Sequence, residues 1–114
     1  MVDEYRQGAR GLGIRPTRIR LLSNLNGEPA VTEQVCTPEY WVRSIREAVR
    51  FHEGVLAIAA DGGTAFRELG PGGVLSALVG DSLAAEPGAV APAAVPLLRS
   101  GRPEAESALT ALAR

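Results

Sequence analysis

The sequence contains no lysine, one cysteine and one histidine, and these absences exclude several kinds of chemistry. All 12 basic residues are arginines, so this chain offers neither a Schiff-base lysine nor the lysine of a P-loop. Cys36 has no second cysteine for an internal disulfide, and Cys36 with His52 does not supply the ligands of a structural zinc site. No apolar run approaches the roughly 18 residues of a membrane span, and no signal-peptide pattern is visible. We therefore expect a cytoplasmic protein.

What remains is typical of a single globular domain. The chain has 114 residues, of which 46% are hydrophobic and 22% charged, close to the globular average. The formal net charge is −1, which does not indicate nucleic acid or an anionic membrane as the main partner.

Apolar spacing and turn residues predict helices and a few short strands. Helices are expected over 1–13, 37–50, 51–60 and 74–83 and from Pro103 onward, and strands over 19–22, 64–69 and 95–98. The stretch 28–36 is expected to be irregular or extended, and the Ala, Pro and Gly of 84–94 predict a linker. The pattern indicates an α/β layer with few strands and exposed sheet edges, which favours part of a larger domain.

Each expected helix carries an apolar stripe that predicts its buried face. The stripes are Val2, Tyr5, Ala9 and Leu12; Trp41, Ile45, Ala48 and Val49; Val55, Ile58 and Ala59; Val74, Leu75, Leu78 and Val79; and Ala105, Leu109 and Leu112.

Candidate nucleophiles and bases are few. His52 is a conceivable general base, but a solvated histidine, or one paired with a carboxylate such as Glu53, is the favoured interpretation. Cys36 precedes a helix N-cap, where a thiolate is slightly favoured, yet a small buried cysteine is the simpler interpretation. No serine lies in a Gly-x-Ser-x-Gly elbow, so the nucleophile turn of hydrolases is absent from this chain.

Two further features are compatible with binding. The turn at Gly70–Gly73, between a strand and a helix, offers backbone N–H groups to an anion, although close packing of helix and strand is the favoured interpretation. Arg15, Arg18 and Arg20 form a modest basic cluster, and without interleaved aromatic residues it indicates a solvated edge or a surface facing another domain.

Three segments taken together resemble one family in their order and spacing. They are LLSNLNGEP at Leu21–Pro29, TPEYWVRSIREAVRF at Thr37–Phe51 and FRELGPGGVLSAL at Phe66–Leu78. They resemble the C-terminal part of the acyltransferase domain of modular type I polyketide synthases. The segment VPLLRSGRPEAESALTALAR at Val95–Arg114 resembles the linker that follows that domain. The resemblance implies part of an α/β-hydrolase-like subdomain with few short strands over 1–83, an Ala/Pro/Gly-rich linker over 84–94, and a linker strand and helix over 95–114.

The resemblance also implies a reaction. In this family a serine, activated by a histidine, accepts a malonyl or methylmalonyl group from coenzyme A. The phosphopantetheine thiol of an acyl carrier protein then takes that group. Acyl-CoA and the phosphopantetheine arm are substrates, and no cofactor or metal is expected to be bound. The implied partners are the remainder of the acyltransferase domain, the adjacent ketosynthase and the carrier protein, with no nucleic acid and no membrane.

The family's serine, histidine and carboxylate-binding arginine belong to segments upstream of this one, so we assign no catalytic residue within the chain. His52 stands where relatives carry a small residue. In related transacylases a main-chain carbonyl orients the catalytic imidazole, and that position falls at or beside Gln34, for which an ordinary loop glutamine is the alternative.

We therefore expect a fragment of an acyltransferase that is inactive alone, with an open sheet edge and exposed apolar surface. One alternative is a non-catalytic docking or scaffold module between synthase domains. A small standalone enzyme that uses Cys36 or His52 is another. The sequence does not indicate which extender unit the parent domain selects.

Overall fold

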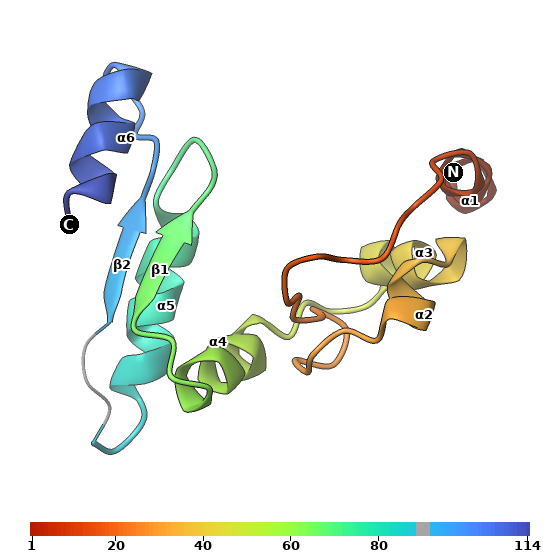
Figure 1. The fold of residues 1–114 in the computed structure, drawn as a ribbon, viewed down its shortest axis with the longest axis horizontal. Helices are drawn as coiled ribbons and strands as arrows, with labels where there is room; N and C mark the ends of the chain where they lie inside the picture. The colour runs from red at the N-terminus through yellow and green to blue at the C-terminus, as the bar shows by residue number, and fades with distance from the viewer. Residues whose placement is uncertain (89–91) are drawn as a thin grey trace. The chain divides into compact units, whose positions relative to one another are not determined.

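The computed structural model describes residues 1–88 and 92–114, and these residues form two compact units, Met1–Gly54 and Val55–Arg114. Figure 1 shows the elements in chain order, and the mixture of helices with a parallel sheet confirms the expected α/β class. The helices are α1 (Val2–Arg10), α2 (Thr32–Val35), α3 (Pro38–Arg46), α4 (Phe51–Ala60), α5 (Val74–Ala84) and α6 (Glu104–Leu112), and the strands are β1 (Ala65–Glu68) and β2 (Ala93–Pro96).

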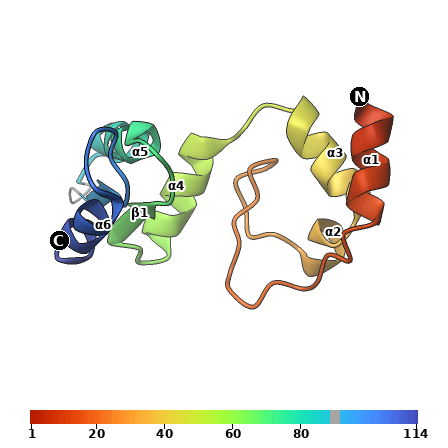
Figure 2. The ribbon, with the colours of Figure 1, turned by 90° about the horizontal axis from the view of Figure 1, so that it is seen from above.

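The first unit is built around the pairing of α1 with α3, which lie side by side in Figure 2. Ala9 of α1 and Val42 of α3 are buried. The Nε of Arg6 lies 3.3 Å from the Glu39 carboxylate and ties the two helices together at their exposed edge.

The expected strand over 19–22 is wrong. Only Leu22 pairs, in an isolated antiparallel bridge with Pro29, and Ile19 is 83% exposed. Among the described residues no neighbouring strand offers the ladder that a strand needs. The turn that follows is as expected: Gly27 has φ +70°, and a Cβ built on it lies 2.7 Å from the Cβ of Glu53, so only glycine fits.

The expectation of irregular structure over 28–36 is wrong for part of that stretch, because α2 occupies Thr32–Val35. The Val31 carbonyl accepts hydrogen bonds from the N–H groups of Gln34 (3.0 Å) and Val35 (3.1 Å) and so closes this single turn. The next helix begins as predicted, with Thr37 as N-cap and Pro38 in the first turn, but it ends at Arg46 because Glu47 is extended.

The second unit contains a two-stranded parallel sheet crossed over by α5. β1 and β2 pair in the register Ala65 with Ala93 through Glu68 with Pro96, and α5 packs on both strands (Figure 1). A parallel pair requires such a crossover, and a helix is the usual way to provide it. Val79, Leu83 and Val95 form the buried centre of this unit.

Most of the expected elements in this half of the chain are confirmed. The helix over 51–60 has the predicted bounds, and β1 and α5 fall within one or two residues of theirs. β2 begins two residues earlier than expected. Residues 89–91 of the expected linker lie outside the described residues, and α5 and β2 include Ala84, Ala93 and Ala94 at its edges. The division at 84–94 stays a prediction.

Several expected inward faces are wrong. The exposed members of the predicted stripes are Tyr5, Leu12, Ile45, Ala48, Val49, Val74, Leu75, Leu78, Ala105, Leu109 and Leu112. The spacing identified the apolar side of each helix, but the described residues provide no further layer to cover it. The sheet edges are likewise open, since β1 and β2 pair only with each other within the described ranges. Exposed apolar surface and open edges are what we expected of part of a larger domain.

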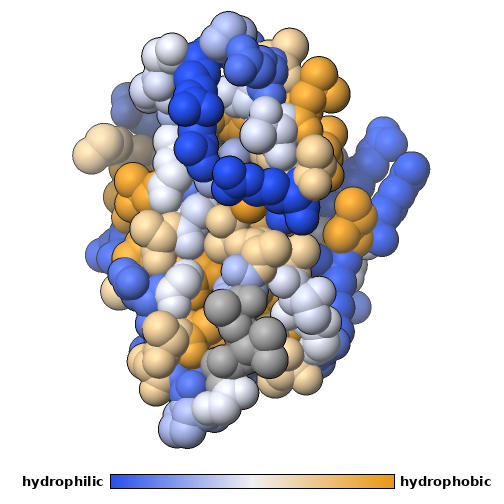
Figure 3. All heavy atoms as spheres, turned by 90° about the vertical axis from the view of Figure 1, so that its left-hand side faces the viewer, coloured by the Kyte–Doolittle hydropathy of each residue, from blue (hydrophilic) through white to orange (hydrophobic). Residues whose placement is uncertain are grey.

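Figure 3 shows the face that carries β2 and α6, where apolar surface lies between charged side chains. On α6 the exposed fractions of Leu109 and Leu112 are 68% and 69%, whereas Ser107 and Ala111 are buried. Across residues 1–88 and 92–114, none of the helices has the length and apolar content that a membrane crossing requires.

Candidate functional site

The corner between α2 and α3 contains Gln34, whose main-chain carbonyl is predicted from the resemblance to orient the catalytic imidazole. Gln34 lies in the last turn of α2, and its carbonyl accepts hydrogen bonds from the Thr37 N–H (3.0 Å) and the Thr37 hydroxyl (2.7 Å). The same hydroxyl accepts the N–H of Tyr40 at 3.4 Å, as an N-cap side chain does. The carbonyl of Gln34 is therefore held in a fixed direction by the residue that starts the next helix.

Aromatic side chains hold this corner against the preceding loop. The indole Nε1 of Trp41 donates to the Val35 carbonyl at 2.8 Å, and Val35 is 2% exposed. The hydroxyls of Tyr40 and Ser23 lie 2.8 Å apart. The rings of Tyr40 and Trp41 meet edge to face, with their centroids separated by 5.2 Å. Such pairs add directional stability beyond the area they bury.

The two side chains considered as a nucleophile and a base are not joined. Cys36 is half-buried at the C-cap of α2, and His52 is exposed in the first turn of α4. The hydrogen bonds of residues 1–88 and 92–114 include none between them. A thiol–imidazole pair requires such a contact, so the arrangement does not provide an activated nucleophile.

Charged side chains near His52 are paired with one another. The pKa of Glu53 is lowered mainly by a hydrogen bond that its carboxylate accepts from the backbone N–H of the same residue. Arg50, whose guanidinium lies 3.2 Å from the carboxylate, lowers the pKa further, and the charge of His52 has a smaller effect in the same direction. At the end of α3, a hydrogen bond from Arg43 lowers the pKa of Glu47 and raises that of Arg43 itself. These ion pairs are exposed to solvent, where such pairs contribute little to stability.

The Gly-rich turn at 70–73 does not present a free anion site at the helix it precedes. The carboxylate of Glu68, at the end of β1, accepts the backbone N–H groups of Leu75 (3.2 Å) and Ser76 (2.8 Å) and the hydroxyl of Ser76 (2.9 Å). The backbone hydrogen bond from Ser76 is the main cause that lowers the pKa of Glu68. Sequence reasoning missed this residue, although a glutamate just before a glycine turn and a helix is the signal that identifies it.

The basic cluster predicted from the sequence lies in an exposed loop. Arg15, Arg18 and Arg20 are exposed in the loop between α1 and α2. Among residues 1–88 and 92–114, no three His, Cys, Asp or Glu side chains gather closely enough to hold a metal ion.

Comparisons with known proteins are informative over the whole chain. No family model matches. The chain is 46% identical over 114 residues to the spectinabilin polyketide synthase system protein NorB of Streptomyces orinoci, covering 100% of this chain and 5% of that protein. It is 37% identical over 114 residues to the mycoketide-CoA synthase of Mycobacterium tuberculosis (strain ATCC 25618 / H37Rv), covering 100% of this chain and 3% of that protein. The chain thus spans only a small part of the curated relatives it matches.

Solved structures give the same result at the level of one domain. The acyltransferase domain from the second module of the salinomycin polyketide synthase matches with a TM-score of 0.83 and 38% identity, covering 98% of this chain and 25% of that one. The acyltransferase domain of SpnD, in complex with 2-(pent-4-yn-1-yl)malonyl, matches with a TM-score of 0.83 and 27% identity, covering 97% of this chain and 27% of that one.

Proposed function

This chain belongs to the acyltransferase domains of modular polyketide synthases, of which it is a C-terminal portion, and from that premise we propose that it serves acyl transfer without carrying the reacting groups. The parent reaction moves a malonyl or methylmalonyl group from coenzyme A to an acyl carrier protein. The nucleophilic serine and its histidine lie on other segments of the domain. The adjacent ketosynthase and the carrier protein are its further partners.

The single observation that supports this proposal is the match along nearly the whole chain to about a quarter of an acyltransferase domain. A quarter of a domain leaves its apolar faces uncovered. The exposed leucines of α5 and α6 fit that situation, because large apolar side chains are normally covered in a complete domain.

In the complete domain this chain orients the catalytic histidine and supplies no reacting group of its own. We assign the main-chain carbonyl of Gln34 the task of accepting the Nδ1–H of the catalytic imidazole, which fixes the tautomer whose Nε2 removes the serine proton. Thr37 holds that carbonyl through two hydrogen bonds. Rotation about the Cβ–Oγ1 bond turns the Thr37 hydroxyl proton away from the carbonyl, which frees one lone pair for the imidazole while the Thr37 N–H keeps its hydrogen bond.

A segment exchange tests the proposed function. This chain replaces the corresponding segment of the salinomycin second-module acyltransferase domain, and transfer of labelled malonyl or methylmalonyl from coenzyme A to a carrier protein is measured. We expect the chimera to transfer the label, and to keep its rate within about twofold when Cys36 and His52 are both replaced by alanine. A correctly folded chimera that transfers no label contradicts the proposal.

A backbone substitution tests the carbonyl. An amide-to-ester change between Gln34 and Val35 makes the Gln34 carbonyl a weaker acceptor. In the chimera we expect kcat to fall about tenfold or more. The acid limb of the pH–rate profile should also move to lower pH, because the imidazolium loses a partner. The matched control is the ester between Glu33 and Gln34, which likewise removes an N–H that donates to the Val31 carbonyl but leaves the Gln34 carbonyl unchanged. Equal effects of the two esters contradict the assignment.

A further inference from the structure

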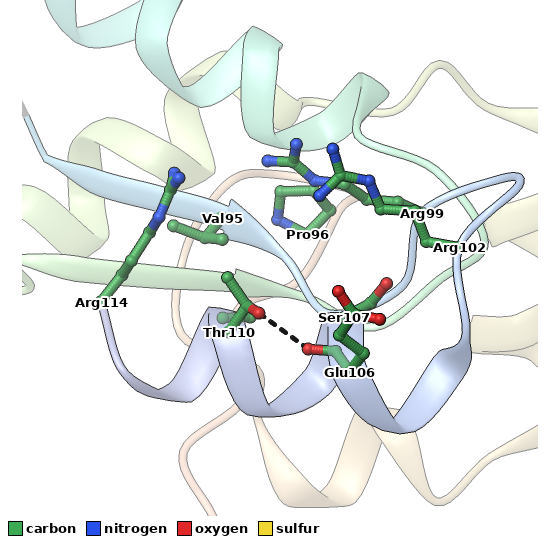
Figure 4. Close-up of a pocket in the computed structure, with 9 residues that line it drawn as sticks. Val95, Pro96, Arg99, Arg102, Glu106, Ser107, Thr110 and Arg114 are labelled. Carbon is green, nitrogen blue, oxygen red and sulfur yellow. Dashed lines mark hydrogen bonds between the residues drawn. The ribbon is translucent and has the colours of Figure 1, made fainter.

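A small hollow between β2 and α6 gathers positive charge. It has space of about 40 Å³, and Figure 4 shows Arg99 and Arg102 extending over Pro96 at one end, with Arg114 at the other. Within the described residues, no ion pair involves any of these three arginines. Glu106 also lines the hollow. Three guanidinium groups and one carboxylate give this site a charge of +2 in a chain whose net charge is −1.

A buried hydroxyl in the same lining has no partner. Ser107 is 7% exposed and lines the hollow, and its Oγ is buried without a hydrogen bond among the described residues. The neighbouring hydroxyl of Thr110 donates to the Glu106 carbonyl at 2.8 Å and is thus satisfied within the helix (Figure 4). Buried polar groups are nearly always paired, and one that is not points to a ligand or water that completes it.

The size and chemistry of the hollow select the ligand. Its volume holds about three water molecules, which is comparable with one tetrahedral oxyanion. A guanidinium group binds two phosphate oxygens with two parallel hydrogen bonds. A phosphate has enough oxygens to pair in this way with more than one arginine, whereas a carboxylate has only one such pair of oxygens. Near pH 7 a phosphate monoester carries a charge of about −1.5 to −2, and inorganic phosphate is a mixture of monoanion and dianion. The dianion accepts hydrogen bonds on its oxygens and so matches the site charge and the free hydroxyl.

We propose that the hollow between β2 and α6 binds a phosphate dianion, held by Arg99 and Arg102 and completed by the hydroxyl of Ser107 and by Arg114. The ligand is either inorganic phosphate or a phosphate monoester carried by a larger molecule. This inference does not depend on acyl transfer, because the residues that carry it belong to the second unit and include no proposed catalytic group.

Titration with inorganic phosphate, followed by the amide signals of the 114-residue chain in nuclear magnetic resonance, tests the proposal. We expect saturable shifts at Arg99, Arg102 and Ser107 with half-saturation in the low millimolar range. The variant Arg99→Gln/Arg102→Gln should weaken binding at least about tenfold. The matched control Arg15→Gln/Arg18→Gln removes the same charge from the other arginine cluster and should change binding less than about twofold. Equal losses in both variants, or shifts that do not saturate, overturn the proposal.

Two further measurements keep the result interpretable. The variant Arg99→Lys/Arg102→Lys retains the charge but not the paired donors, and we expect about a threefold or greater loss; unchanged affinity contradicts the proposed geometry. The same titrations in the salinomycin chimera apply the test where the segment lies within a complete domain. Loss of phosphate binding with intact acyl transfer overturns this inference alone, and the reverse overturns the proposed function alone.

Comparison of coenzyme A with dephospho-coenzyme A distinguishes the sources of the phosphate. If the site takes a phosphate monoester, coenzyme A binds more tightly than both dephospho-coenzyme A and inorganic phosphate. If the site takes the free anion, inorganic phosphate binds at least as tightly as either. Binding of both coenzymes with equal affinity, unaffected by Arg99→Gln/Arg102→Gln, contradicts a phosphate site at this hollow.

Discussion

The two strand-to-helix junctions of the second unit differ in how their polar groups are satisfied. After β1, the carboxylate of Glu68 accepts hydrogen bonds from the start of α5. After β2, arginines surround a hollow in which the hydroxyl of Ser107 has no partner among the described residues. The first junction is complete within the chain and stabilises the fold. The second has more donors than acceptors, with three arginines and one glutamate in its lining, and so is where a ligand is expected.

This difference shows why a motif alone is a weak guide to an anion site. The glycine turn before α5 has the composition of a phosphate-binding loop, yet the donors at the helix start are used by Glu68. The hollow beside α6 has no such motif. An excess of positive charge, together with an unpaired buried hydroxyl, is the more informative signal.

Removing the carboxylate at the complete junction should have the largest effect. In Glu68→Ala, three donors of Leu75 and Ser76 lose their acceptor. We expect the thermal midpoint of the chain to fall by about 5 °C or more, measured by circular dichroism. The control Glu86→Ala removes an exposed glutamate beyond α5 and should leave the midpoint within about 1 °C. Equal midpoints in the two variants would mean that Glu68 does not cap α5.

The same junction should impose a pH dependence. The pKa of Glu68 is lower in the folded chain than its ordinary value of 4.5. Its contribution is therefore complete above about pH 4.5 and is lost as the pH falls through the folded pKa. We expect the difference in stability between the wild type and Glu68→Gln to be constant from pH 7 to pH 5 and to shrink below. Glu47 and Glu53, whose pKa values are also lowered, titrate in both proteins and cancel in this difference.

The buried serines Ser23 and Ser107 allow the same comparison between a hydroxyl with partners and a hydroxyl without one. Ser23 is 4% exposed, and its hydroxyl pairs with the Tyr40 hydroxyl and accepts the Leu25 N–H. Ser23→Ala should lower the free energy of unfolding by about 1 kcal/mol, measured by urea denaturation. A double-mutant cycle with Tyr40→Phe should show coupling of about 0.5 kcal/mol or more. Additive effects would indicate that the two hydroxyls do not interact.

The smallest effect is expected at the unpaired serine. Ser107→Ala removes a hydroxyl that has no partner, so the free energy of unfolding should change by less than about 0.5 kcal/mol, or rise. Urea denaturation in phosphate-free buffer measures this change. A loss above about 1 kcal/mol would show that the hydroxyl is satisfied within the chain and would weaken the contrast between the two junctions.

Local signals predicted the helices well. Thr37 and Pro38 identified the start of α3, and Asp61 with two glycines identified the end of α4, because caps and turn residues act over a few positions. The strand expected at 19–22 failed because a strand exists only with a partner, and the single turn of α2 is too short to show a period.

Burial was predicted less well than helix position. The spacing of Leu109 and Leu112 identified an apolar side of α6, but the buried residues of this helix are Ser107 and Ala111. A stripe indicates which side of a helix is apolar, but the described residues provide no layer that covers this one. Neither Glu68 nor the hollow near Ser107 was predicted, since both depend on contacts across the β–α junctions, whereas Gln34 remains a prediction drawn from resemblance.

Covalent labelling of the isolated chain tests the central claim most directly. The 114-residue chain and the salinomycin chimera are incubated with radioactive malonyl-CoA, denatured and separated by electrophoresis. The claim that the reacting groups lie on other segments predicts label on the chimera and none on the chain. Stable label on the chain alone, lost in Cys36→Ala or His52→Ala, would contradict it.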